Sequence, residues 1–235
     1  MNYFFQPTLD QSVSQFSLSP EESRHIVKVL RKKEADILHV TNGKGYLFTV
    51  EITVADPKGC RGRIVGTEKK IPPRFSLHLA VAPTKRLERF QWFLEKATEI
   101  GVSEITPILC HRSERRKAPV ERLQRVVQEA MKQSLRTYLP RLNPEVRFAD
   151  FLTQQHPPMR FIAHCEEDEK MDLKRRVAPD KDVVVLIGPE GDFTREEIEA
   201  AYARGFLPVS LGESRLRTET AALVACSTVN LINSG

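Results

Sequence analysis

The sequence predicts an α/β domain with a mainly parallel sheet, preceded by a small β domain, and three observations support this. In residues 71–235, short apolar runs alternate with amphipathic helical segments, as in a parallel α/β sheet. One run, 183–187, is apolar at every position, which is typical of a strand buried on both faces. Residues 1–70 instead contain short runs rich in β-branched and aromatic residues around a hairpin signal.

The first 70 residues are expected to form a small closed β domain. The hairpin signal is Asn42-Gly-Lys-Gly45, and Ser19 is a plausible N-cap for the one expected helix, 20–30. The expected strands are 36–41, 46–54 and 59–66. Lys69–Arg74 contains consecutive prolines and is the best linker candidate, so the domain boundary is expected near residue 70.

The remaining chain predicts strands alternating with helices. The expected strands are 76–82, 105–110, 160–165, 183–187 and 207–211, and the expected helices include 87–100, ended by Gly101, and 119–139, stopped by Pro140. Thr194 and Glu197 form a capping box that opens another helix. Residues 221–232 are apolar on almost every face, which predicts a helix buried on both sides, with a second subunit as one candidate for the outer side. Thr218 or Thr220 is the expected cap of this helix.

Two loops near the C-terminus carry the polar residues of most interest. The first, Gly188–Asp192, lies between a buried strand and a helix, but Glu190 and Asp192 would repel a phosphate group. A neutral or cationic ligand fits that loop better. The second loop places Arg217 and Glu219 above a buried helix, which is costly unless the two side chains pair or serve a ligand.

Composition narrows the function classes. The chain is 40% hydrophobic and 29% charged, and no apolar run approaches the ~20 residues of a membrane helix. A formal charge of +5 with recurring basic clusters favours a nucleic acid partner; one cluster contains Arg112, Arg115, Arg116 and Lys117. Four separated cysteines without a CxxC pair predict reduced thiols, no structural metal and, with no secretory signal at the N-terminus, a cytoplasmic protein.

Four motifs in order resemble one known family over nearly the whole chain. They are His25–Arg31, Glu95–Gly101, Ile187-Gly-Pro-Glu-Gly191, and Leu211-Gly212 followed by Leu216-Arg-Thr-Glu-Thr-Ala221. By these residues the chain resembles the 16S rRNA (uracil-N3)-methyltransferase family, a branch of the SPOUT, or trefoil-knot, methyltransferases. The resemblance implies a PUA-like RNA-binding barrel over 1–70 and a SPOUT domain over 71–235 with a deep C-terminal trefoil knot and a homodimeric assembly.

The resemblance also implies S-adenosylmethionine as methyl donor and the decoding region of small-subunit 16S rRNA as substrate. The residues that it assigns to the cofactor are His164, Ile187, Gly188, Pro189, Glu190, Gly191, Leu211, Gly212, Leu216, Thr218 and Ala221. Arg217 is the expected cation that stabilises a developing uridinate. Glu219 is the second catalytic candidate, although Glu190 or a water could equally accept the proton. The residues expected to grip RNA are Lys28, Arg31, Lys85, Arg86 and Arg136.

The sequence departs from the family pattern at several positions. Asp192 and Leu135 stand where the family often has glycine, Lys132 stands where it usually has glutamate, and Tyr3 stands where an early arginine is frequent. Ser214-Arg215 replaces a commoner Arg-Ile. Two other functions therefore stay open: a SPOUT ribose 2'-O-methyltransferase acting on tRNA or rRNA, and a non-catalytic RNA-binding ribosome assembly factor.

Overall fold

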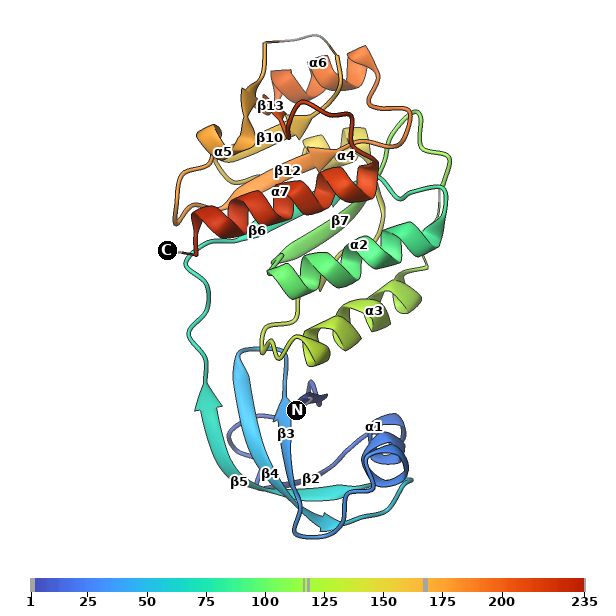
Figure 1. Cartoon of the computed structure of the whole chain (residues 1–235), viewed down its shortest axis with the longest axis vertical. Helices are drawn as coiled ribbons and strands as arrows, with labels where there is room; N and C mark the ends of the chain where they lie inside the picture. Colours follow the sequence, from blue (N-terminus) through green and yellow to red (C-terminus); the bar gives the residue numbers. More distant parts are fainter. Residues whose placement is uncertain (1–2, 116, 118, 167–168, 235) are drawn as a thin grey trace. The chain divides into compact units, whose positions relative to one another are not determined.

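The computed structural model describes residues 3–115, 117, 119–166 and 169–234 (Figure 1). The chain divides into two compact units. Unit 1 contains the described residues up to Pro72 together with Met131–Leu139, and unit 2 contains Pro73–Ala130 and the described residues from Pro140 onward. No helix within these described residues combines the length and the apolar character needed to cross a membrane.

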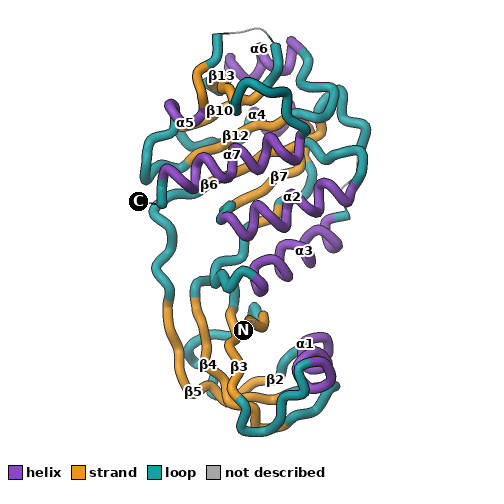
Figure 2. Tube along the Cα trace, viewed as in Figure 1, coloured by secondary structure: helices purple, strands orange, loops and turns teal. Residues whose placement is uncertain are grey.

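Unit 1 is built on a five-stranded sheet with the order β1-β3-β4-β5-β2. Figure 2 shows β2, β3, β4 and β5 of this sheet in orange. Its strands are β1 (Tyr3–Phe5), β2 (Gln15–Ser17), β3 (Ile37–Thr41), β4 (Tyr46–Val54) and β5 (Arg61–Lys69). The β1–β3 pair is parallel and the other pairs are antiparallel. Within the described residues β1 and β2 are the two edges, so the sheet is a half-barrel and the expectation of a closed barrel is corrected. Phe48, Val50 and Ile26 lie in its apolar core.

The expected helix 20–30 changes its hydrogen-bond pattern halfway. It starts as α1 (Pro20–Arg24) and continues as the π-helix η1 (His25–Val29). The Ser19 cap is confirmed, because its hydroxyl accepts a hydrogen bond from the Glu22 amide at 3.2 Å. The Glu22 carboxylate in turn pairs with Lys132 Nζ at 2.9 Å, and both side chains are largely buried.

The helix expected over 119–139 is shorter in the structure, because the segment Met131–Leu139 belongs to unit 1. Helix α3 (Val120–Gln133) ends early, and the chain then pairs with the hairpin of unit 1. The Gly45 amide donates to Thr137 O and the Leu139 amide donates to Gly43 O, both at 2.9 Å. Leu135 has a φ of 57°, a left-handed conformation that ends the helix.

We expect the Leu135→Gly substitution to stabilise the protein. Leu135 is exposed and adopts the left-handed region, where a side chain costs about 1 kcal/mol and glycine adopts the same backbone with little strain. The free energy of unfolding in urea should therefore rise by about 1 kcal/mol. The control is Leu135→Ala, which shortens the side chain but keeps Cβ and should give no such gain. Destabilisation by the glycine would contradict the expectation.

Unit 2 contains an eight-stranded sheet whose main path is β11-β13-β10-β12-β6-β7-β8, with β9 also paired to β7. Its strands are β6 (Leu77–Val81), β7 (Glu104–Leu109), β8 (Arg141–Leu142), β9 (Val146–Arg147), β10 (Met159–Ala163), β11 (Met171–Asp172), β12 (Val183–Ile187) and β13 (Leu207–Ser210). All these pairings are parallel, which confirms the predicted mainly parallel sheet.

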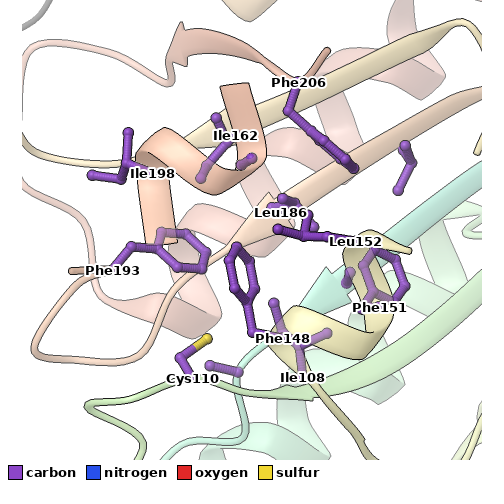
Figure 3. Packing of buried hydrophobic residues seen from close by; sticks show 14 residues of the cluster. Ile108, Cys110, Phe148, Phe151, Leu152, Ile162, Leu186, Phe193, Ile198 and Phe206 are labelled. Carbon is purple, nitrogen blue, oxygen red and sulfur yellow. The ribbon is translucent and has the colours of Figure 1, made fainter. Parts of the chain in front are cut away.

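Helices cover both faces of this sheet. The helices of unit 2 are α2 (Leu87–Ile100), the first part of α3, α4 (Phe148–Leu152), α5 (Leu173–Arg176), α6 (Arg195–Ala203) and α7 (Thr218–Ile232). Val184 and Leu186 of β12 belong to the core cluster formed with α4 and α6 (Figure 3). Because side chains alternate along a strand, Val183, Val185 and Ile187 point to the other face, where α7 packs against β12, β6 and α2 (Figure 1). The trefoil knot stays a prediction.

Helix signals and cysteines follow the sequence closely. Gly101 caps α2 with a φ of 126°, and Thr194 and Glu197 form the predicted capping box of α6. Cys60, Cys110 and Cys226 are buried free thiols, whereas Cys165 is exposed. Burial raises the pKa of the Cys110 and Cys60 thiols, so both remain protonated at neutral pH.

His78 in β6 is expected to make the fold acid-sensitive. Burial lowers its pKa from 6.5 to about 4, and its Nε2 lies 2.7 Å from Thr106 Oγ1. The unfolded chain therefore takes up a proton at a higher pH than the folded chain. Below pH 6.5 this uptake lowers the free energy of unfolding, and the loss levels off below pH 4 at about 3 kcal/mol or less.

The His78→Gln substitution should reduce this loss. Urea unfolding at several pH values between 7 and 4 measures the slope of stability against pH, and we expect a shallower slope in the variant than in the wild type. The glutamine side chain retains a partner for Thr106 but does not titrate. Equal slopes for the two proteins would show that His78 is not responsible.

Candidate methyl-donor site

Three loops meet at one edge of the unit 2 sheet. They follow β10, β12 and β13, and the sheet order is β13-β10-β12 with parallel pairing throughout. The carboxyl ends of parallel strands lie at the same edge, where open α/β sheets bind their ligands. The bends after Ile187 and Leu211 therefore share this edge as predicted. They are not on adjacent strands, however, because β10 lies between β12 and β13.

A pocket of about 700 Å³ lies among these loops and the start of α7, a volume typical of small-molecule sites. Ten of the eleven predicted cofactor residues line it: His164, Ile187, Gly188, Pro189, Glu190, Leu211, Gly212, Leu216, Thr218 and Ala221. Gly191 lies outside this lining. Its carbonyl accepts a 2.8 Å hydrogen bond from Arg112 Nη1 instead, which supports the loop from behind.

The pocket also contains residues that sequence reasoning missed. They include Cys165, Lys170 and Glu213. Cys165 and Lys170 come from the loop after β10, for which His164 was the only predicted contact. The signal that could have found them is the parallel sheet itself, because every loop at the carboxyl edge of neighbouring strands is a candidate.

Thr218 joins two of the pocket segments and is not a helix cap. Arg217 is the N-cap residue of α7 and makes no capping hydrogen bond with its side chain, so the prediction of Thr218 or Thr220 is wrong. The Thr218 hydroxyl instead donates to the Gly188 carbonyl at 3.0 Å in a buried position. At the first position of α7 its hydroxyl faces the loop after β12, and it therefore fixes that loop to the helix.

Glycines shape both bends. A Cβ on Gly188 would lie 3.0 Å from ring atoms of Phe193, so a side chain there would displace the loop. Gly212 has a φ of 129°, which favours glycine, and its amide donates to Ser210 Oγ at 3.2 Å. Ser210 Oγ returns a hydrogen bond to the Gly212 carbonyl at 3.1 Å. The sequence motif thus reflects backbone conformation as well as ligand access.

The pocket carries charges of both signs. Acidic side chains come from Glu190, Asp192 and Glu213, and basic side chains come from Lys170, Arg215 and Arg217. A small molecule with both positive and negative groups matches this lining better than a polyphosphate does. Burial and the nearby Asp192 carboxylate raise the pKa of Cys165, so that thiol stays protonated and is a poor nucleophile.

His164 lines the pocket from a largely buried position. Its Nε2 lies 2.8 Å from the Tyr202 hydroxyl, and its carbonyl accepts a hydrogen bond from Lys170 Nζ at 2.7 Å. The ring is therefore oriented by α6 and the main chain is held by the lysine. This arrangement fits a wall of the pocket more closely than a group that moves protons.

The two predicted catalytic residues have different surroundings. Arg217 is exposed and lines the pocket, and its guanidinium makes no hydrogen bond or ion pair within the described residues. Glu219 is buried and does not line the pocket; its Oε1 lies 3.7 Å from Arg89 Nε of α2. Its Oε2 has no hydrogen-bond partner among the described residues. The Arg217–Glu219 pair considered from sequence is therefore absent, and the position of Glu219 favours a role in joining α7 to α2.

The predicted RNA-binding residues are distributed over both units. Lys28, Arg31 and Arg136 belong to unit 1, and Lys85 and Arg86 belong to unit 2. Lys28, Arg31, Lys85 and Arg86 are exposed. The Lys85 ammonium pairs with Glu114 at 2.7 Å, and the Lys85 amide donates to Glu190 Oε1 at 3.0 Å. Lys85 thus supports the pocket loop as well as presenting charge.

Part of the basic cluster at 112–117 is structural. Arg112 donates to the carbonyls of Gly191 and Phe193, and Arg115 donates to those of Thr84 and Lys85. These guanidinium groups fasten loops of unit 2 to one another. Lys117 is exposed, and Arg116 lies outside the described residues. Within the described residues, no group of three or more His, Cys, Asp or Glu could hold a metal ion.

Comparison with known proteins identifies the family. Residues 71–230 match the model of the RNA methyltransferase domain. The chain belongs to this family. Residues 18–65 match the model of the RNA methyltransferase PUA domain, in agreement with the half-barrel of unit 1.

Relatives of this RNA methyltransferase match it over nearly their full length. The ribosomal RNA small subunit methyltransferase E of Rickettsia conorii is 31% identical over 94% of this chain and 91% of its own. A probable rRNA methyltransferase from Porphyromonas gingivalis is 40% identical, with a TM-score of 0.92 and coverage of 100% and 99%. A putative methyltransferase from Legionella pneumophila, solved with bound SAM, is 30% identical, with a TM-score of 0.89 and coverage of 98% and 97%.

Proposed function

We propose that this RNA methyltransferase transfers a methyl group from S-adenosylmethionine to N3 of a specific uridine in the decoding region of small-subunit 16S rRNA. The observation that carries the proposal is the pocket of about 700 Å³ formed by the three loops, with Arg217 exposed in its lining. The Rickettsia relative is named as a small-subunit rRNA methyltransferase, and the Legionella relative binds SAM.

The pocket suits this methyl donor chemically. When bound, S-adenosylmethionine supplies an electrophilic methyl group on a positively charged sulfur. In the proposal, backbone amides and carbonyls of Leu211, Gly212 and Leu216, which line the pocket, meet the adenine edge. Glu190 favours positive groups, whereas Arg215 and Lys170 can bind a carboxylate.

Arg217 would act on the target base. N3 of uracil carries a proton and becomes a good nucleophile only when that proton leaves, and the resulting negative charge spreads onto O2 and O4. A guanidinium donates two hydrogen bonds in a fixed geometry and stabilises such charge strongly in a sheltered site. The guanidinium of Arg217 is available for this role because Glu219 pairs with Arg89 and Glu190 accepts from the Lys85 amide.

Both units would hold the RNA. The target base must leave its stack to reach the pocket, so the flanking strand has to be gripped. In the proposal, Lys28, Arg31 and Arg136 of unit 1 and Lys85 and Arg86 of unit 2 bind phosphates. The domain boundary near residue 70 and a location in the cytoplasm, where the ribosomal substrate is found, belong to the same proposal.

A homodimer would complete the assembly. Leu231 of α7 is 74% exposed and Trp92 of α2 is 47% exposed, so these two adjoining helices retain apolar surface. In the proposal a second copy of the chain covers this surface. Light scattering on the purified chain tests it, and a mass of one chain across the micromolar range would contradict it.

Two assays test the proposed reaction. Calorimetry with S-adenosylmethionine asks whether the cofactor binds, and a non-catalytic assembly factor need not bind it. Small subunits that lack the modification are then incubated with the protein and the methyl donor, and their nucleosides are analysed by mass spectrometry. We expect N3-methyluridine. Methylation of the ribose 2'-oxygen would instead indicate the related ribose methyltransferase activity.

A further inference from the structure

Asp192 connects two of the three pocket loops. Its Oδ2 accepts a hydrogen bond from the Cys165 amide at 2.7 Å, across a separation of 27 residues. Its Oδ1 accepts from the Phe193 amide at 2.8 Å. Each carboxylate oxygen therefore has its own backbone donor, one in the loop after β10 and one in the loop after β12. Hydrogen bonds to an ionised carboxylate are about twice as strong as neutral ones.

The backbone at Asp192 adopts a conformation that costs free energy for a residue with a side chain. Its φ is 64°, in the left-handed region that favours glycine, and its amide donates to Pro189 O at 2.9 Å to close the turn. Aspartate tolerates this conformation better than most residues, but glycine tolerates it best. Backbone preference alone does not explain an aspartate here, whereas the bond to the Cys165 amide does.

We propose that Asp192 is a positioning residue that holds the loop after β10 against the loop after β12 and so sets the width of the methyl-donor pocket. The proposal rests on the proposed function of this pocket. Ala163, His164, Cys165 and Lys170 form the part of the pocket wall that comes from the loop after β10, and Gly188, Pro189 and Glu190 form the part that comes from the loop after β12. The Asp192 carboxylate joins the first part to the second at Cys165. Without it the part of the wall formed by the first loop would lose that attachment and move outward.

A different role for Asp192 makes a different prediction. If its negative charge acted directly on the cofactor, it would favour S-adenosylmethionine, which has a positively charged sulfur, over S-adenosylhomocysteine, whose sulfur is neutral. The proposed role is that of a latch, by which we mean that the Asp192 carboxylate holds the loop after β10 to the loop after β12. Loss of the latch would weaken the binding of both ligands equally. The engagement of both carboxylate oxygens by backbone amides favours the latch.

The test uses the full chain and the Asp192→Gly variant. Glycine suits the backbone at this position, so the variant should still fold while losing the latch, because relief of the left-handed strain offsets part of the lost stability. We expect calorimetry to show that the affinities for S-adenosylmethionine and S-adenosylhomocysteine both become weaker, by up to about a hundredfold, because the free energy of a hydrogen bond to a charged group sets the upper limit of the effect. The KM for the methyl donor should rise more than kcat falls.

Hydrogen exchange supplies a readout that does not depend on ligand binding. The Cys165 amide should exchange at least tenfold faster in Asp192→Gly than in the wild type, because its acceptor is gone. Asp192→Asn keeps one acceptor oxygen and should lie between the two proteins. The matched control is Asp180→Gly, since Asp180 also has a left-handed φ, of 56°, but does not line the pocket. This control should leave both affinities and the exchange of Cys165 unchanged.

Three results would overturn the latch: ligand affinities within twofold of wild type, a loss confined to S-adenosylmethionine, or unchanged exchange at the Cys165 amide. Failure of the proposed function gives a different result. In that case the wild-type chain itself binds neither ligand, while the exchange at Cys165 still reports whether Asp192 holds the loop.

Discussion

Replacing Arg217 with alanine should lower the rate of uridine methylation by about 10² to 10³, the usual effect of removing one donor to a developing anion. The guanidinium lies in the pocket lining and is not occupied by Glu219 or Glu190, whose carboxylates are engaged by Arg89 and the Lys85 amide. Because Arg217 would act on the transition state of the base, kcat should fall while the affinity for S-adenosylmethionine changes by no more than about threefold.

Single-turnover methylation of small subunits, followed by nucleoside mass spectrometry, measures this rate. Arg217→Lys keeps the positive charge but cannot donate in a planar fork, so its rate should lie between those of the wild type and the alanine variant. Arg195→Ala is the control, because Arg195 is exposed on α6 and, among the described residues, forms its ion pair with Glu199 four residues away. Full methylation by Arg217→Ala with normal cofactor affinity would exclude the assigned role.

Elements whose ends carry local signals could be predicted closely from the sequence. Strands β4 and β12 and helix α2 occupy the predicted residues, 46–54, 183–187 and 87–100. In each, hydrophobic periodicity fixes the type of element and a neighbouring glycine, proline or polar turn fixes an end. The bends at Gly188 and Gly212 could be predicted from the same kind of local signal, because tight backbone turns require particular residues.

Contacts between distant residues could not be predicted in this way. The Thr218 hydroxyl binds a carbonyl 30 residues earlier, and β10 lies between β12 and β13 although it precedes both in the chain. The early end of α3 is a similar case, since the segment after Gln133 pairs with the hairpin around Gly45. Strand order and tertiary pairing depend on packing that periodicity does not contain.

The role of the basic clusters could not be predicted from the sequence, for a related reason. Arg112 and Arg115 belong to a basic stretch that favoured a polyanionic partner, yet both guanidinium groups bind main-chain carbonyls of nearby loops. Composition counts a structural arginine and a ligand-binding arginine equally. The sequence also could not show that Glu219 pairs with Arg89 and not with Arg217, because this ion pair depends on where α2 places Arg89.

Two departures from the family pattern have one backbone explanation. By the resemblance, Leu135 and Asp192 stand where glycine is expected, and both adopt a left-handed φ, 57° and 64°. A backbone of this conformation favours glycine at both positions. Leu135 is exposed, and its substitution by glycine should stabilise the fold, whereas Asp192 uses its side chain to bind the Cys165 amide.

The Gly45→Ala substitution should destabilise unit 1 by about 3 kcal/mol. Gly45 has a φ of 89°, and a Cβ at this position would clash with the Tyr138 hydroxyl. Left-handed backbone costs about 1–2 kcal/mol for a residue with a side chain, and overpacking costs a similar amount. Tyr138 cannot move away freely, since its hydroxyl donates to the Lys70 carbonyl at 2.9 Å.

Urea unfolding followed by circular dichroism measures this loss. Gly59→Ala is the matched control, because a Cβ on Gly59 meets no atom within 4 Å, and its stability should stay within about 0.5 kcal/mol of wild type. Adding Tyr138→Ala to Gly45→Ala removes the clash but not the backbone strain. The alanine at position 45 should therefore cost less in the Tyr138→Ala background than in the wild type. A Gly45→Ala protein as stable as the wild type would show that the pairing of Met131–Leu139 with the hairpin does not constrain this glycine.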